Sequence, residues 1–276
     1  MRAPRPMTAV VALALLAGCS GQPTSIVLAT TTSTQDSGLL DELVPRFTDA
    51  TGIAVKTIAV GSGQAIELAR RGEADVVLVH SPADEEALVA DGATGRRLLV
   101  MHNDFVLVGP DDDPAGVAGA DVDDALETIA ATGSPFVSRG DDSGTHTKEL
   151  ALWSVTGTDP AGDWYVETGQ GMAATLRVAD ERRGYALADR ATYLSQADTL
   201  ALEVVVEGDP GLLNVYHVIE MTAAAGDRVE ADGAAAFADW IVSDPAQETI
   251  GAFGAGEFGR PLFVPDAGKD LADLTG

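Results

Sequence analysis

Apolar and polar residues follow two recurring patterns along the chain. Runs rich in Val, Ile, Leu and Ala, such as residues 25–29 and 74–80, have the length and composition of buried parallel strands. Such runs are followed by segments whose apolar residues recur at spacings of three and four, as on one face of a helix. The first helical face comprises Leu39, Leu40, Leu43, Val44 and Phe47. This alternation predicts an α/β fold with doubly wound, mainly parallel sheets.

The remaining segments extend the same alternation and divide it into two lobes. The pattern predicts strands at residues 53–60, 105–110, 135–138, 164–167, 185–188, 200–207 and 212–219, and helices at residues 65–71, 83–90, 121–131, 147–155, 172–180, 234–242 and 245–253. Two β-rich passages bracket one α/β block, which predicts two lobes joined by a hinge of two crossing strands, at 105–109 and 215–219. One lobe then comprises residues 25–104 and 217–276, and the other comprises residues 105–216.

Polar loops join strands to helices at residues 30–38, 61–63 and 139–146. Because parallel strands present their carboxyl ends on one side, we expect the first two loops and residues 80–81 to lie along one edge of a sheet. The first turn of a helix has unpaired N–H groups and a positive dipole end, which favour an anion. The loops therefore predict an anion-binding site.

Hydroxyl groups are concentrated in the first two of these loops. Thr32, Ser33 and Thr34 follow the first strand, and Ser62 follows the second. These side chains are candidate donors to an anion. The alternative is that they only cap the helices, since Ser and Thr are common N-cap residues.

Arg139 begins the most polar of the loops. It is a candidate charge-assisted donor to the anion, with Ser143 and Thr145 as neutral donors. The alternative is a surface ion pair between Arg139 and either Asp141 or Asp142.

Residues 140–144, Gly-Asp-Asp-Ser-Gly, also resemble the Gly-Asp-Ser-Gly motif of chymotrypsin-like proteases, with Ser143 as the nucleophile. That motif belongs in an antiparallel barrel, whereas this one lies between a predicted strand and a helix. Residues 141–145 do not match the Gly-x-Ser-x-Gly elbow of α/β hydrolases. We therefore expect a binding protein and not an enzyme, and a serine hydrolase is the less favoured alternative.

Neither a metal site nor a cofactor is predicted. The four histidines are scattered, there is one cysteine, and no Asp-x-Asp-x-Asp-Gly loop occurs.

The N-terminus has the features of an export signal. Arg2 and Arg5 precede an apolar run at residues 7–16, which is too short to span a bilayer as a helix. Residues 16–19, Leu-Ala-Gly-Cys, resemble the lipobox of bacterial lipoproteins. This predicts a signal peptide at residues 1–18, lipidation of Cys19, a tether to residue 24 and an extracytoplasmic, lipid-anchored protein. The alternative is a soluble secreted protein with a free Cys19 thiol.

The composition limits the partners of the exported body. Apolar residues make up 46% of the chain and aromatic residues 5%, which is typical of a globular α/β protein. A net charge of −26 argues against nucleic acid as a partner, because that interaction requires basic patches. The same charge repels anions at long range, so an anion site must act at short range. We expect a monomer.

Five sequence blocks occur along the chain. They are Thr-Thr-Thr-Ser-Thr-Gln-Asp-Ser-Gly-Leu-Leu (30–40), Val-Gly-Ser-Gly (60–63), Ala-Asp-Val-Val-Leu-Val-His-Ser (74–81), Asn-Asp-Phe-Val-Leu-Val-Gly-Pro (103–110) and Ser-Arg-Gly-Asp-Asp-Ser-Gly-Thr-His (138–146). Together these blocks resemble the TupA-type tungstate-binding proteins of ABC importers. The resemblance covers essentially the whole chain after the signal peptide.

The resemblance implies a periplasmic-binding-protein fold that grips tungstate between two lobes and delivers it to a membrane permease. Molybdate is a further candidate ligand, and phosphate or sulfate is the alternative oxyanion. By position, the resemblance assigns Thr32, Ser33, Thr34 and Ser62 to the first lobe's side of the ligand. It assigns Arg139, Ser143 and Thr145 to the second lobe's side.

Overall fold

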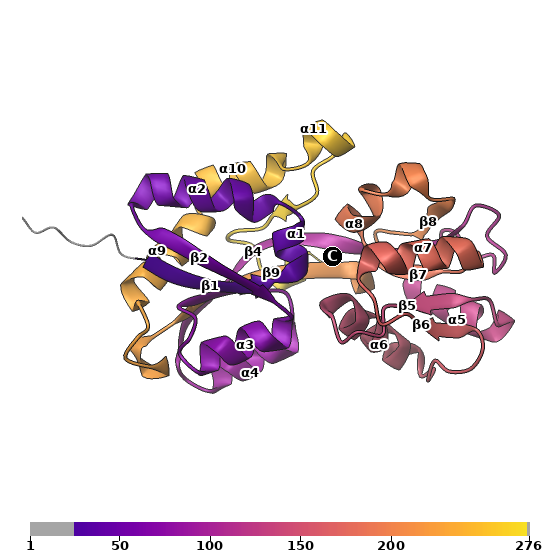
Figure 1. Ribbon diagram of the computed structural model, residues 1–276, viewed down its shortest axis with the longest axis horizontal. Coiled ribbons are helices and arrows are strands. Elements are labelled where there is room, and N and C mark those ends of the chain that lie inside the picture. Colours follow the sequence, from indigo (N-terminus) through magenta and orange to yellow (C-terminus); the bar gives the residue numbers. More distant parts are fainter. Residues whose placement is uncertain (1–24, 275–276) are drawn as a thin grey trace, which may run out of the picture.

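The computed structural model describes residues 25–274 and shows an α/β protein with two lobes side by side (Figure 1). The expected α/β fold class and two-lobed architecture are confirmed. The predicted signal peptide, the lipidation site Cys19 and the tether lie outside the described residues. Within residues 25–274, no helix has the length and apolar character needed to cross a membrane.

The first lobe is built on one sheet with the strand order β10-β4-β9-β3-β1-β2. Its strands are β1 (Ser25–Thr31), β2 (Ala54–Val60), β3 (Val76–Val79), the first part of β4 (Thr94–Pro110), β9 (Leu213–Met221) and β10 (Val264–Pro265). β1 pairs in parallel with β2 and β3, as expected. However, β9 runs antiparallel between β3 and β4, so the sheet is mixed and not mainly parallel. The reason is that β9 brings the chain back from the second lobe.

Helices cover both faces of this sheet (Figure 1). They are α2 (Leu39–Thr51), α9 (Ala231–Ile241) and α10 (Asp244–Ala252) on one face, and α3 (Ser62–Arg70) and α4 (Pro82–Ala90) on the other. In β1, Ile26 and Leu28 pack with the first group, while Ala29 packs with the second. Because both faces are covered, the strand is apolar on both sides, which explains its uninterrupted apolar sequence.

The second lobe has the same layered plan. Its strands are the end of β4, β5 (Phe136–Ser138), β6 (Tyr165–Glu167), β7 (Ala186–Asp189) and β8 (Leu202–Val206), and its helices are α5 (Val122–Thr132), α6 (Gly144–Thr156), α7 (Met172–Arg182) and α8 (Arg190–Leu194). β7 and β8 both pair antiparallel with β4, while β5 and β6 are parallel. One core forms against α5 and α6, and another against α7.

Two strands carry the chain between the lobes. β4 pairs with β9 as far as Asp104 and with β7 from Phe105 onward, so the outward crossing lies between these residues. On the return, Leu212 packs in the core of the second lobe, and Leu213 already pairs with Asp104. The lobe boundary predicted after Tyr216 therefore falls inside β9. The two crossings between the lobes thus lie at Asp104/Phe105 and at Leu212/Leu213.

The hydroxyl-rich loop differs from the sequence expectation. Thr32, Ser33 and Thr34 do not lie in a loop, because they belong to a separate short helix, α1 (Thr32–Asp36). Gly38, at φ 82°, then starts α2. The turn at Gly38 requires a left-handed backbone conformation, which glycine adopts without steric cost.

Candidate functional site

The hydroxyls at the end of β1 form a hydrogen-bonded cluster. Thr31, the N-cap of α1, accepts a hydrogen bond from the backbone N–H of Thr34 (3.2 Å). Its Oγ1 also lies 2.7 Å from Thr34 Oγ1 and 3.0 Å from Ser33 Oγ. Thr34 is fully buried, Ser33 is partly buried and Thr32 is exposed. Thr31 is therefore the centre of the cluster, and Thr34 lies beneath it.

His80 adjoins this cluster from the end of β3. Its Nε2 lies 3.2 Å from Thr31 Oγ1 and 3.4 Å from Ser33 Oγ. Burial lowers the pKa of His80 to about 4, and the nearby Glu85 opposes this shift only in part. The imidazole is therefore neutral at pH 7, so the cluster is bounded by neutral groups.

Ser62 lies at the neighbouring strand end. β1 and β2 are parallel with Thr31 opposite Val60, so α1 and α3 begin side by side. Ser62 is the first residue of α3, whose N-cap Gly61 provides no side-chain cap. Its hydroxyl oxygen is buried and has no hydrogen-bond partner among the described residues. A buried polar atom of this kind normally has a partner, so Ser62 has an unfilled hydrogen bond at the edge where the site is expected.

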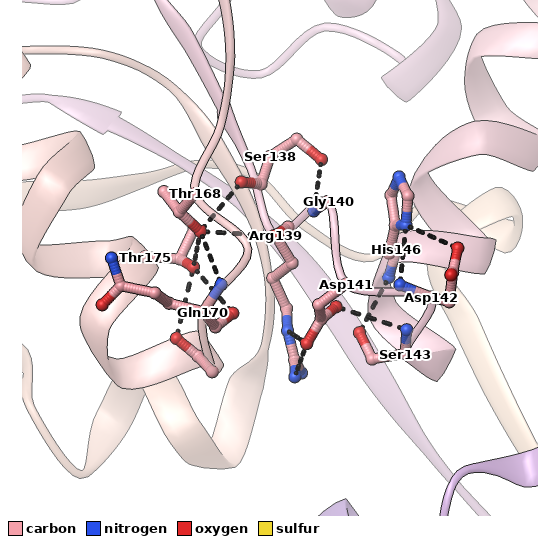
Figure 2. A network of polar contacts seen from close by, with 11 residues as sticks. Ser138, Arg139, Gly140, Asp141, Asp142, Ser143, His146, Thr168, Gln170 and Thr175 are labelled. Carbon is pink, nitrogen blue, oxygen red and sulfur yellow. Dashed lines mark hydrogen bonds and ion pairs between the residues drawn. The ribbon is translucent and has the colours of Figure 1, made fainter.

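Arg139 places a positive charge on the second lobe's side of the site, and a carboxylate holds its guanidinium in position. Its Nη2 lies 2.5 Å from Asp141 Oδ2, and its Nε also donates to that oxygen at 3.2 Å (Figure 2). Arg139 and Asp141 keep only 16% and 20% of their side-chain exposure. Burial alone would raise the pKa of Asp141, but hydrogen bonds from Ser143 and Arg139 hold it below its usual value. The expected alternative, an Arg139–Asp141 ion pair, is thus present, but both side chains are largely buried and Arg139 lines a cleft.

Ser143 and Thr145 both lie at the start of α6. Ser143 is the N-cap, and its oxygen accepts a hydrogen bond from the backbone N–H of His146 (3.3 Å; Figure 2). Thr145 is 6% exposed. Asp142, in contrast, is fully exposed, and its backbone N–H donates to Nδ1 of His146. The Ser143 hydroxyl is therefore used within its own loop.

A second helix of this lobe begins beside Arg139, and the sequence did not identify it as part of the site. α7 follows Gly171, which provides no side-chain cap. The preceding loop is fixed by Thr168, whose Oγ1 lies 2.9 Å from Thr175 Oγ1 and 3.3 Å from the carbonyl oxygen of Arg139 (Figure 2). The sequence signal that could have identified this helix start is Gly-Gln-Gly at residues 169–171. These residues precede an apolar helical pattern and offer no Ser, Thr, Asp or Asn to cap the helix.

Some of these groups line a cleft of about 940 Å³ between the lobes. Of the predicted site residues, Thr32, Ser33 and Arg139 line it, and the start of α7 lines it with them. Thr34, Ser62, Ser143 and Thr145 are not among its lining residues; they lie at or beneath the starts of α1, α3 and α6. The structure thus brings part of the predicted set to the cleft from both lobes.

The arrangement contains no catalytic triad around Ser143. Within the described residues, the Ser143 oxygen accepts from a backbone N–H, its hydroxyl hydrogen-bonds to Asp141, and no imidazole is hydrogen-bonded to it. Nor do the described residues contain a group of three or more metal-ligating side chains.

The chain is similar to known binding proteins. Residues 19–245 match the family model of the PBP superfamily domain. The tungstate-binding protein TupA of Peptoclostridium acidaminophilum is 49% identical over 95% of this chain and 98% of its own length. The solved structure of the tungstate-binding protein TupA of Desulfovibrio alaskensis G20 has 44% identity and a TM-score of 0.81, covering 88% of this chain and 99% of that one. A structure of the tungstate ABC transporter from Geobacter sulfurreducens has 44% identity and a TM-score of 0.73, covering 83% and 98%.

Proposed function

This chain belongs to the TupA family of tungstate-binding proteins, within the PBP superfamily, and on that premise we propose that it binds tungstate between its lobes and delivers it to the permease of an ABC importer. The observation that carries the proposal is the cleft, which is lined by hydroxyl residues of the first lobe and by Arg139 of the second. Donors from two lobes that share one ion favour the closed arrangement of the lobes.

The donor set suits a dianion that carries no proton. Tungstate presents only acceptor oxygens, which hydroxyls, helix N-termini and one guanidinium can all meet. The hydroxyl of Ser62, which has no partner among residues 25–274, would gain an acceptor on binding. Arg139 contributes positive charge, but its pairing with Asp141 makes the protein's own contribution close to neutral. Most of the selectivity would then come from the number and direction of the hydrogen bonds.

Phosphate is the informative competitor. HPO₄²⁻ carries a hydroxyl that requires an acceptor, and a donor-rich site leaves that proton unpaired. Asp141 is the carboxylate paired with Arg139, and both of its oxygens already accept hydrogen bonds, from Arg139 and from the backbone N–H of Ser143. We therefore expect tight tungstate binding and weak phosphate binding. Molybdate has the same charge and shape as tungstate, so we expect it to bind as well.

The proposal includes the location and partners of the protein. A substrate-binding protein of an importer works outside the cytoplasm, and the lipobox-like sequence ending at Cys19 would attach it to the membrane beside its permease. We propose a monomer that acts without a cofactor and catalyses no reaction.

Calorimetric titration of the chain from residue 20 onward, with tungstate, molybdate, sulfate and phosphate, tests the function. We expect one tungstate per chain, with phosphate at least 100-fold weaker. Arg183, an exposed arginine paired with Asp112, provides a charge-matched control, since Arg183→Ala removes the same charge far from the cleft. Equal affinity for phosphate and tungstate would exclude tungstate as the selected ligand and favour the phosphate alternative.

A further inference from the structure

His80 lies between the two halves of the site. It follows β3 in the first lobe, and its ring packs on Tyr216 of β9, with 4.7 Å between ring centroids. At one edge its Nε2 reaches Thr31 and Ser33. Thus Tyr216 supports the ring while the hydroxyl cluster fixes its edge.

The ring carbon next to Nε2, Cε1 of His80, meets the second lobe at Gly144. A Cβ built on Gly144 would lie 3.0 Å from His80 Cε1, which is closer than ordinary van der Waals contact. Gly144 is the first residue of α6, directly after the N-cap Ser143. No other side chain could occupy this position without moving the imidazole.

The glycine at position 144 is not required by its own backbone. Its φ is not positive, in contrast to the neighbouring Gly140 at φ 57°. Glycine is also less favourable than alanine within a helix, by about 0.5–1 kcal/mol. The close approach of His80 is therefore the local feature that accounts for this residue, and that approach exists only while α6 lies against the first lobe.

We propose that His80 and Gly144 form the contact at which the lobes close, and that His80 is a positioning residue that aligns Thr31 and Ser33 when α6 arrives. In the closed state the imidazole is enclosed by Tyr216, the hydroxyls and Gly144. In an open state it loses the Gly144 side and gains freedom to turn. The lobes would then close and the hydroxyls of the first lobe would become aligned in the same step. This inference rests on the proposed oxyanion function.

The test introduces a methyl group at the contact and then makes room for it. Gly144→Ala should weaken tungstate binding about tenfold, because the added Cβ holds the lobes apart. Small-angle scattering should show a smaller decrease in radius on tungstate addition than in the parent. The melting temperature should stay the same or rise, since alanine favours the helix. Ser154→Ala, on the exposed face of α6, is the control, because it also favours the helix but does not line the cleft.

Replacing His80, alone and together with Gly144, completes a double-mutant cycle. His80→Ala should weaken binding by losing the alignment of the hydroxyls, and His80→Gln, which keeps a donor and an acceptor, should recover part of the loss. In His80→Ala/Gly144→Ala the extra methyl meets open space, so binding should be no weaker than in His80→Ala alone, and the radius should again decrease on binding. Gly144→Ala binding as tightly as the parent, or losses that simply add in the double variant, would overturn the inference. A parent that binds no oxyanion would instead overturn the proposed function.

Discussion

The two sides of the cleft use different chemistry for the same ligand. On the first lobe, Thr31, Ser33 and Thr34 bond to one another and to a neutral imidazole, with no formal charge in the cluster. On the second lobe, the principal group is a charged one, Arg139, and its charge is balanced at once by Asp141.

This difference indicates that the two lobes contribute different interactions to binding. A hydroxyl cluster sets the number and direction of donors but contributes little long-range attraction. An ion pair supplies a strong local donor whose net charge is close to zero. In a chain of net charge −26, neither side offers the anion a long-range field, so binding depends on contacts made at short range. The comparison can be tested by changing each side in turn.

The largest effect is expected at Arg139. Arg139→Ala removes the arginine that lines the cleft from the loop before α6, and it leaves Asp141 without its arginine partner. A charge-assisted hydrogen bond contributes about 1.5–3 kcal/mol, so tungstate affinity should fall roughly 10- to 100-fold or more. Arg139→Lys keeps the charge but loses the planar fork, and its loss should be intermediate.

Calorimetry at fixed salt measures this series, with Arg183→Ala as the charge control. Unchanged affinity in Arg139→Ala would mean that the ion pair with Asp141 is purely structural. The hydroxyls and the helix N-termini would then hold the oxyanion alone.

Acidification should affect the first lobe through His80. Its folded pKa of about 4 lies below the ordinary value of 6.5, so the unfolded chain binds more protons at intermediate pH. The stability associated with neutral His80 is therefore present above pH 6.5 and is lost as the pH falls toward 4. Between pH 7 and 5 the loss is at most roughly 2 kcal/mol.

Denaturant unfolding of the parent and of His80→Gln, at pH 7 and pH 5, isolates this contribution. The carboxylates titrate in both proteins, so only the difference between the two matters. The parent should lose more stability on acidification than the variant. Identical losses would show that His80 is not held in its neutral form.

Ser62 should show a smaller effect, confined to binding. Its buried hydroxyl has no partner among the described residues, so Ser62→Ala should leave the stability of the unliganded protein unchanged or slightly raised. If the hydroxyl donates to the ligand, tungstate affinity should fall about 2- to 10-fold, equivalent to about 0.5–1.5 kcal/mol. A loss of stability without a loss of affinity would remove Ser62 from the site.

The strand and helix pattern could be predicted from the sequence where both faces of an element are buried. β3, with the sequence Val-Val-Leu-Val, is one such strand. The first part of β4 was not predicted, because its Gly-Arg-Arg start at residues 95–97 has no apolar pattern. These residues extend because β9 pairs with them, and Arg97 is held there by the buried Glu85 at 2.7 Å. Such long-range partners are not visible in a local pattern.

The types of side chain in the site could be predicted from the sequence, but the directions in which they point could not. The hydroxyls and Arg139 were recognisable as donors, yet the separate helix α1 turns Thr34 into the interior and leaves Ser33 at the cleft. Likewise, the role of Gly144 depends on His80, which comes from the other lobe. Side-chain direction at a strand end depends on the neighbouring strand and helix, and not on residue type alone.

The smallest effect on binding is expected at Ser143, although the sequence made it a candidate ligand. Its oxygen caps α6 by accepting from the N–H of His146, and its hydroxyl helps to keep the pKa of Asp141 low. Both hydrogen-bonding functions are thus used within the loop. Ser143→Ala should lower the free energy of unfolding by about 1 kcal/mol through loss of the cap, with less than about a threefold change in tungstate affinity.

Ser143→Asp separates the two roles. Aspartate is an equally good N-cap, so it should restore stability, but its charge at the start of α6 should repel the anion. Thermal unfolding and calorimetry on the same samples give both quantities. If Ser143→Ala instead loses tungstate affinity as strongly as Ser62→Ala while keeping its stability, the Ser143 hydroxyl faces the ligand, and the second lobe contributes neutral donors as well as charge.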